Sequence, residues 1–317
     1  MSQEDLSKQD VEPSSEQAPQ PVYYQPPASH ENHHKQMVKW LTISFTSLFV
    51  LAALFIFFAD RILINLPFSA EKKFVRPYEE ITRYFGDDES SVERDDIEAY
   101  LDKLTADIAS KMNLPADMEV EVHYLDTDAV NAFATLGGHV FVCRGLMETL
   151  DDENSLAMII GHELAHIKNR DPIVGMARGL TIQMLYSYLT GDYSSLNVSG
   201  LGSELGLSYF SREQERKADS MGIEALNAHY GHVAGFDSLF SALQDNDDMQ
   251  NDHQDSHTAQ NESNWFSSHP DLNERIADLT KQAESNNWSS GEVQAYPAHI
   301  VVAIQTIGEN KVLGKKK

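Results

Sequence analysis

The sequence is poor in features on which several classes of protein depend. It has one cysteine, Cys143, so an intrachain disulfide is impossible and the fold must rest on its core. Basic residues are scarce, and 24 lysines and arginines against 49 aspartates and glutamates give a net charge of −25. This excess repels phosphate backbones, so we expect no nucleic-acid partner. No internal repeat is evident, and 317 residues suffice for one large domain or two ordinary ones.

Long uncharged runs are also rare, and the clearest extends from Trp40 to Ala59. At a helical rise of about 1.5 Å per residue it spans about 30 Å, the thickness of a bilayer's hydrocarbon core. A core helix of this length would carry a polar face, and a signal peptide would be shorter and nearer the terminus. We therefore expect a single-pass membrane protein that contacts the lipid bilayer through this helix, residues 37–60. The flanking charges leave the membrane side of the remaining chain open.

The rest of the chain divides by composition and periodicity. Residues 1–36, rich in Gln, Ser, Pro and Glu, are expected to form a disordered tail. Residues 61–290 have the patterns of a mainly helical α+β domain with a small sheet, interrupted by a flexible acidic loop at 245–264. Residues 291–317 are expected to hold a short strand around 300–304 and a basic tail.

Within that domain, apolar spacing predicts the individual elements. Period-two alternation predicts a strand at 119–125, followed by a hairpin whose strands are joined by a two-residue turn, Gly137-Gly138. Helical spacing predicts five helices, at residues 95–112, 153–170, 172–189, 205–228 and 271–284.

The stretch GHELAHIKNRD, residues 161–171, contains an H-E-x-x-H pattern. With 13 histidines in the chain, such a pattern arises by chance in roughly one chain in twenty-five. On a helix, however, His162 and His166 lie one turn apart on one face, a geometry that suits a tetrahedral zinc ion. Glu163 is rotated by about 100° from His162, so it can serve as a general base beside the metal. These polar groups lie in an apolar helix and need partners, which a metal would supply.

A catalytic zinc needs a third protein ligand. The segment SREQERKADSMG, residues 211–222, offers Glu215 on a helix face of small residues that also carries Asp219. Glu213 points almost the opposite way, among basic residues. The alternative is that Glu215 and Asp219 form surface ion pairs, and spacing alone does not decide between the two.

Four segments in this order, NAFATLGGHVFVCRGL, GHELAHIKNRD, SREQERKADSMG and SSHPDLNERI, carry a resemblance to a known family. Over residues 70–285 the chain resembles the CAAX prenyl protease/HtpX family of membrane-associated zinc metallopeptidases. The resemblance implies a zincin-type metallopeptidase domain, one Zn²⁺ per chain, and protein or peptide substrates that are hydrolysed by a zinc-activated water.

The resemblance also implies a role for each matching residue. His162, His166 and Glu215 would be the zinc ligands, and Glu163 the catalytic base. Asp219 would orient a ligand histidine. The strand residues Asn131, Ala132, Phe133 and Ala134 would pair with an extended substrate backbone. His269 and Arg275 would bind the substrate and stabilise the oxyanion, although a loop histidine and a surface arginine would look the same in sequence.

The chain departs from the family pattern at two points. Leu136 stands where the family often has proline, and one membrane helix is evident where the prenyl proteases and HtpX have several. The single anchor favours relatives that degrade damaged envelope or membrane proteins, and hence a role in protein quality control. The competing hypothesis is a catalytically silent, membrane-anchored binding or chaperone-like protein of the same fold. Such a protein would normally lack Glu163 or a ligand, and this sequence retains them.

Overall fold

The computed structural model describes residues 30–63, 65–73, 91–150, 152–192, 210–236, 269 and 272–314. Contacts divide the chain into two units, Met1–Phe49 and Val50–Lys317. All elements below except the first part of helix α1 belong to the second unit. The predicted acidic loop at 245–264 and residues 1–29 of the predicted tail lie outside the described residues.

Helix α1 (His30–Leu63) contains the predicted membrane span and extends beyond it at both ends. Residues 30–36, which were expected to belong to the disordered tail, are helical instead, because an apolar helix once nucleated extends readily into polar residues. Among the described residues, α1 is the one helix long and apolar enough to cross a membrane, from His33 to Phe58. None of that apolar window is buried.

Helix α4 (Val92–Lys111) confirms the helix predicted at 95–112. It begins earlier than predicted because the Ser91 side chain accepts a hydrogen bond from the Arg94 backbone and caps the first turn. One face of α4 is buried in the main core.

The three described strands form one sheet in the order β1-β3-β2. Strand β1 (Glu121–Leu125) lies parallel to β3 (His139–Cys143), and β2 (Ala132–Ala134) pairs antiparallel with β3. The predicted strand and hairpin are confirmed, but the two-residue turn is wrong. Residues 135–138 connect β2 to β3 through a 3-10 turn, η1 (Leu136–Gly138). Gly138 adopts a φ of +93°, and a Cβ there would lie 2.1 Å from the Glu119 carbonyl oxygen, so only glycine fits.

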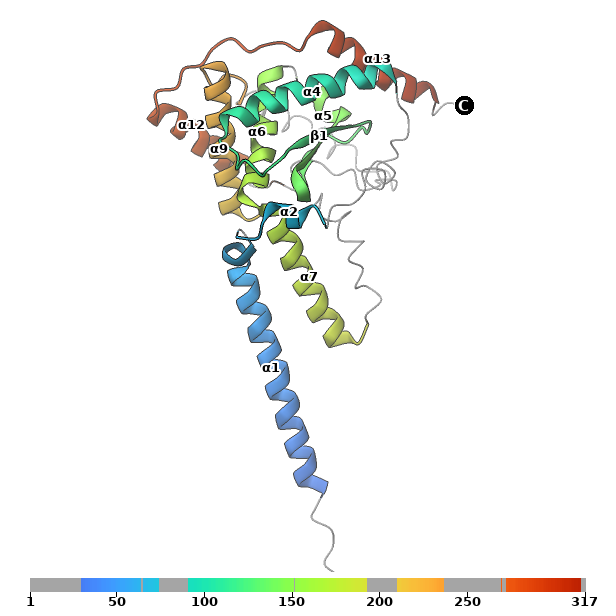
Figure 1. Ribbon diagram of the computed structural model, residues 1–317, viewed down its shortest axis with the longest axis vertical. Helices are drawn as coiled ribbons and strands as arrows, with labels where there is room; N and C mark the ends of the chain where they lie inside the picture. The colour runs from blue at the N-terminus through green and yellow to red at the C-terminus, as the bar shows by residue number, and fades with distance from the viewer. Residues whose placement is uncertain are drawn as a thin grey trace, which may run out of the picture. The chain divides into compact units, whose positions relative to one another are not determined.

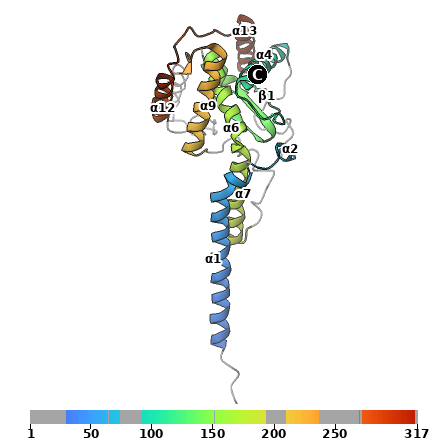
Figure 2. The same cartoon turned by 60° about the vertical axis from the view of Figure 1, so that its left-hand side comes forward.

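Two long helices carry most of the residues that the sequence predicts to bind a metal. Helix α6 (Glu153–Asn169) passes between the sheet and α9 (Arg212–Tyr230), and the two helices run side by side in both views (Figures 1 and 2). They approach closely because glycines meet at the crossing: a Cβ on Gly161 would lie 3.2 Å from the Cα of Gly222. Helix α9 begins at Arg212, later than predicted, because Ser211 and Gln214 form a capping box there.

Helix α7 (Asp171–Thr190) follows α6 almost immediately. The predicted break is confirmed, since Arg170 between the helices has a left-handed φ of 65° and Pro172 lies in the first turn of α7. At the other end, Gly191 closes α7 with a φ of 72°.

The C-terminal segment differs from its prediction. Residues 300–304, expected to form a strand, belong to helix α13 (Ala298–Gly314), which packs on α4. Ile300, Ala303 and Ile304 are buried in the main core, a helical spacing that overrides the β-propensity of the HIVVAI run. This core therefore extends past residue 290, where the domain was expected to end. The remaining elements are α2 (Phe68–Glu71), α5 (Arg144–Thr149) and α12 (Leu272–Ser285).

Candidate metal centre

Helix α6 brings two imidazoles to one point. His162 and His166 are 1% and 0% exposed, and their Nε2 atoms lie 3.0 Å apart. The helix is well anchored before this point, because the Asp152 side chain caps its first turn through the Ser155 amide at 2.8 Å. Two nitrogens held this close in a dry interior favour a shared cation.

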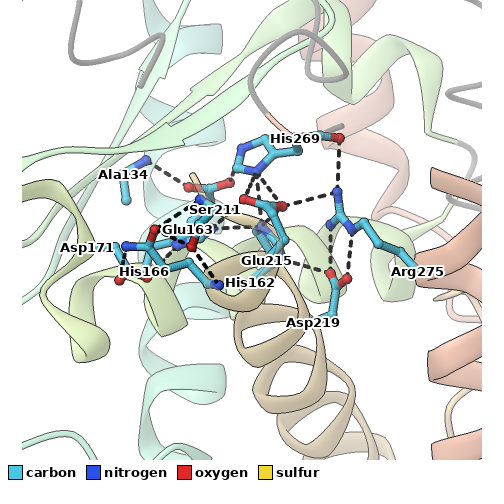
Figure 3. Close-up of polar contacts among 11 residues, drawn as sticks. Ala134, His162, Glu163, His166, Asp171, Ser211, Glu215, Asp219, His269 and Arg275 are labelled. Atoms are coloured by element: carbon cyan, nitrogen blue, oxygen red, sulfur yellow. Dashed lines mark hydrogen bonds and ion pairs between the residues drawn. The ribbon is translucent and has the colours of Figure 1, made fainter. Parts of the chain in front are cut away.

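A carboxylate from α9 faces the same point (Figure 3). The two oxygens of Glu215 lie 3.6 Å from His162 Nε2 and 3.5 Å from His166 Nε2, and the residue is 2% exposed. Glu213, two residues earlier on the same helix, is exposed. The opposed directions expected for these two glutamates are present in the structure.

His269 also points into this cluster. Its Nδ1 lies 3.3 Å from His162 Nε2 and 2.9 Å from the Glu215 carboxylate. Ligand atoms of His162, His166, Glu215 and His269 all lie within 4.8 Å of one another. The residue expected to bind substrate is thus close enough to offer a fourth donor to a metal.

Each α6 histidine is oriented by a carboxylate on its other ring nitrogen. Asp219 accepts from His162 Nδ1 at 2.9 Å, the contact expected from the sequence, and Asp171 accepts from His166 Nδ1 at 2.8 Å. Asp171 was not predicted as a site residue, since it lies between the helices expected at 153–170 and 172–189. The rule that a ligand histidine uses its second nitrogen to reach a carboxylate could have found it. Gln214 in turn donates to Asp171 at 2.7 Å.

Arg275 is buried, and its guanidinium is directed at the carboxylates of Asp219 and Glu215 (Figure 3). Two of its nitrogens donate to Asp219 at 2.7 Å each, and the third lies 3.2 Å from Glu215 and donates to the His269 carbonyl at 3.1 Å. Burial alone would raise the pKa of Asp219, but Arg275 and His162 hold it well below its usual value. Arg275 therefore holds two buried carboxylates in place, and its expected contact with a substrate oxyanion stays a prediction.

The protonation of the three imidazoles follows from burial and partners. Burial lowers the pKa of His162 to about 4, although its carboxylate partner acts in the opposite direction. Burial, with the neighbouring His166, also lowers the pKa of His269 well below its usual value. Burial is the largest effect on His166 and opposes its protonation, but the Asp171 hydrogen bond together with the charges of Glu215, Asp171 and Glu163 outweighs it and raises that pKa. His162 and His269 are therefore neutral at pH 7, the form that ligates metals.

Glu163 connects this centre to the sheet. It is 0% exposed, and one carboxylate oxygen accepts a hydrogen bond from the Ala134 backbone amide at 2.8 Å. The other oxygen lies 3.6 Å from His269 Nε2. Glu163 is therefore held beside the cluster and against strand β2.

The four residues expected to bind substrate adjoin Glu163 through Ala134. Asn131, Ala132, Phe133 and Ala134 are all buried, so a peptide could reach their backbone only if the groups that cover them move. A further aromatic contact was not expected from the sequence. The ring of Phe210 stacks on His166, with ring centroids 3.9 Å apart and planes 17° from parallel.

Comparison with known proteins gives a match over most of this domain. The sequence profile of peptidase family M48 matches residues 96–283. The beta-barrel assembly-enhancing protease of Escherichia coli (strain K12) is 26% identical over 156 residues, 44% of this chain and 30% of that protein. The protease HtpX homolog of Salinibacter ruber is 28% identical over 204 residues, 56% of this chain and 73% of that protein. The metalloprotease LoiP of E. coli is 31% identical over 120 residues, 36% of this chain and 47% of that protein.

Proposed function

Since the chain belongs to peptidase family M48, we propose that it is a zinc-dependent endopeptidase anchored to a membrane by α1. The observation that carries the proposal is the convergence of His162, His166 and Glu215 on one buried point, with Glu163 beside it. The matched segment spans only 25–30% of several curated relatives, such as the beta-barrel assembly-enhancing proteases of Yersinia pestis and E. coli. Activity, substrates and a role in protein quality control are therefore proposals for this chain.

The donor set fits zinc. Two imidazole nitrogens and one carboxylate are ligands that zinc prefers. The nitrogens lie 3.0 Å apart and each lies 3.5 or 3.6 Å from a different oxygen of the carboxylate, distances close to the edge of about 3.3 Å in a tetrahedral zinc site. When bound here, zinc would polarise the scissile carbonyl and lower the pKa of a water molecule. Asp219 and Asp171 would hold the two histidine rings in the orientation that ligation needs.

Glu163 has the placement of a general base. The Ala134 amide fixes one of its carboxylate oxygens at 2.8 Å, so the carboxylate stays at the edge of β2. A peptide that pairs with this edge would bring its scissile bond next to the carboxylate. Glu163 would then take a proton from the attacking water and pass it to the leaving amine.

We assign His269 to the substrate side of the centre. A catalytic zinc keeps one coordination position open, and of the four clustered residues we take His162, His166 and Glu215 as its ligands. The His269 ring, which faces both Glu215 and Glu163, would donate a hydrogen bond to the carbonyl of a bound peptide. Arg275 would be a positioning residue that holds Asp219 and Glu215 in place.

The test is to measure zinc per chain and casein cleavage in detergent, with and without chelator. We expect Glu163→Gln to keep zinc and to lose turnover by about 10²–10⁴-fold, because base and ligand roles are separate. Glu215→Ala should lose zinc, whereas its exposed neighbour Glu213→Ala should keep both zinc and turnover. His269→Ala should keep zinc with reduced turnover. Normal turnover by Glu163→Gln would refute the mechanism, and equal zinc in the Glu215 and Glu213 variants would refute the ligand assignment.

A further inference from the structure

A second group of metal-ligating side chains lies outside this centre. Glu121, His123 and His139 each offer one ligand atom, and these atoms all lie within 4.8 Å of one another. We propose that the three side chains form a second site for a divalent transition-metal ion such as zinc. The proposal rests on this cluster alone and stands whether or not the chain is a peptidase.

The pairing of two strands creates the cluster. β1 and β3 are parallel, with Glu121 opposite His139. His123 lies two residues after Glu121, and alternation along a strand puts both side chains on the same face of the sheet. The intervening Val122 belongs to the main core, so the three ligand groups lie on the opposite face.

The separations match those of the first centre. His123 Nε2 lies 2.9 Å from His139 Nδ1, and His139 Nδ1 lies 3.6 Å from Glu121 Oε2. At the first centre the two histidine nitrogens lie 3.0 Å apart, and each lies 3.5 or 3.6 Å from a different oxygen of the Glu215 carboxylate. Both sets bracket the edge of about 3.3 Å expected for tetrahedral zinc. A set of two imidazoles and one carboxylate does not suit magnesium or calcium, since those ions favour oxygen ligands.

The surroundings keep the two imidazoles in the neutral form that binds metals and leave the cluster open to solvent. Burial lowers the pKa of His123 to about 4 and also lowers that of His139, so both rings are neutral at pH 7. The side chain of Glu121 is 63% exposed, which leaves a path for an ion from solvent. Two cations lie nearby, and each has a carboxylate partner: Lys72 pairs with Glu119 and Arg94 with Glu98.

An ion here would act on the hairpin that reaches the first centre. The His139 carbonyl accepts from the Thr135 amide at 2.8 Å, which closes the connection between β2 and β3. The residue before Thr135 is Ala134, whose amide holds Glu163. Ligation of His139 would therefore stabilise the end of the hairpin that positions the proposed base.

The experiment is a zinc titration of the full-length chain in detergent, after chelator treatment, by isothermal titration calorimetry. We expect two equivalents of zinc in the wild type. Glu121→Gln, an exposed change that leaves the fold intact, should weaken one equivalent by about 10-fold or more, and His139→Gln should abolish it. Glu215→Ala should remove the other equivalent and leave this one, so failure at one centre is distinguishable from failure at the other.

Two controls separate the site from adventitious binding. Asp117→Asn removes an exposed carboxylate four residues before Glu121 that is not a ligand, and His229→Ala removes a histidine elsewhere on the domain. Both should keep two equivalents. In the wild type, the second equivalent should also slow hydrogen exchange in a peptide covering residues 132–143.

Either of two results would overturn the proposal. A single equivalent in the wild type would mean that the 2.9 Å contact between His123 and His139 is only a hydrogen bond. A second equivalent that survives both Glu121→Gln and His139→Gln would mean that zinc binds elsewhere, for example at the histidines near the start of α1.

Discussion

The Asp219 carboxylate links His162 of the candidate metal centre to Arg275 of helix α12. It orients His162 and accepts two hydrogen bonds from Arg275, all in a buried environment. A buried carboxylate is costly without a counter-charge, and Asp219 and Glu215 share the same guanidinium. Arg275 is thus the residue on which the electrostatic balance of the metal-free centre depends.

Removal of that cation should destabilise the metal-free protein. We expect Arg275→Ala to lower the free energy of unfolding by about 3–5 kcal/mol, because two buried carboxylates lose their partner. Zinc should restore more stability to the variant than to the wild type, since the ion itself neutralises the carboxylates. Arg275→Lys should rescue only partly, because a point charge cannot reproduce the planar fork. Thermal unfolding with and without zinc measures all three effects.

Arg212→Ala is the matched control for this prediction. Arg212 is 67% exposed and lies 3.9 Å from Glu274, so its loss should change stability by less than about 0.5 kcal/mol. If Arg275 instead binds the oxyanion, Arg275→Ala would leave stability and the zinc effect unchanged and lower kcat by about 10²–10³-fold.

At the scale of elements, the centre depends on how closely α9 approaches α6. The two histidines come from α6 and the carboxylates Glu215 and Asp219 from α9, so the separation of the helices sets the separation of the ligands. Glycine at the crossing allows this approach, because a Cβ on Gly222 would lie 3.2 Å from the backbone nitrogen of His162.

A side chain at this crossing should push the helices apart. We expect Gly222→Val to cost about 1–3 kcal/mol of stability through overpacking, and to weaken zinc binding because the displaced backbone is that of His162. Ala228→Val introduces the same residue on an exposed position of α9, and it should have little effect on either quantity. Differential scanning fluorimetry with a zinc titration of both variants checks this, and equal zinc affinity in the two would contradict it.

At the scale of the whole molecule, the domain begins with residues that follow directly on α1. Phe68 is 1% exposed and belongs to the main core, and the Glu71 carboxylate pairs with Arg170 at 2.5 Å. The short helix α2 is therefore part of the domain, although it follows directly on the apolar helix.

Two truncations should behave differently for this reason. A chain that starts at Asn65 keeps α2 and should need no detergent while retaining peptidase activity. A chain that starts at Glu71 loses Phe68 and should be less stable by about 3–5 kcal/mol. Sedimentation and thermal unfolding of both chains test this. If the longer chain still binds membranes, the exposed apolar residues Ile182, Met184 and Tyr186 of α7 would be the next contact to examine.

The buried histidines predict how stability depends on pH when metal is removed. His162 and His123 have folded-state pKa values of about 4 against 6.5 for the free side chain. Between these values only the unfolded chain takes up the protons, so stability is full above about pH 6.5 and falls as the pH approaches 4. The raised pKa of His166 has the opposite sign, but His269 and His139 also have lowered pKa values and add to the effect of His162 and His123. We expect the Tm in chelator to fall from pH 7 to pH 5, and a flat profile would contradict this.

The sequence by itself determined the features that depend on near neighbours. The helical spacing around His162 and His166, the break before α7 and the apolar run of α1 all follow from a few consecutive residues. Local periodicity, capping and backbone restriction act over one or two turns, so they can be read directly from the chain. The opposed faces of Glu215 and Glu213 follow in the same way from helix geometry.

Only the tertiary structure decided which distant groups meet. His269 contacts His162, which is 107 residues away in the sequence, and Arg275 donates hydrogen bonds to Asp219, which is 56 residues away. No local pattern indicates either contact. The same holds for residues 300–304, where packing on α4 makes a helix of a run with the composition of a strand. It holds also for His139, which reaches His123 because β1 and β3 pair in parallel. Such contacts depend on how helices and strands pack, which is a property of the whole core.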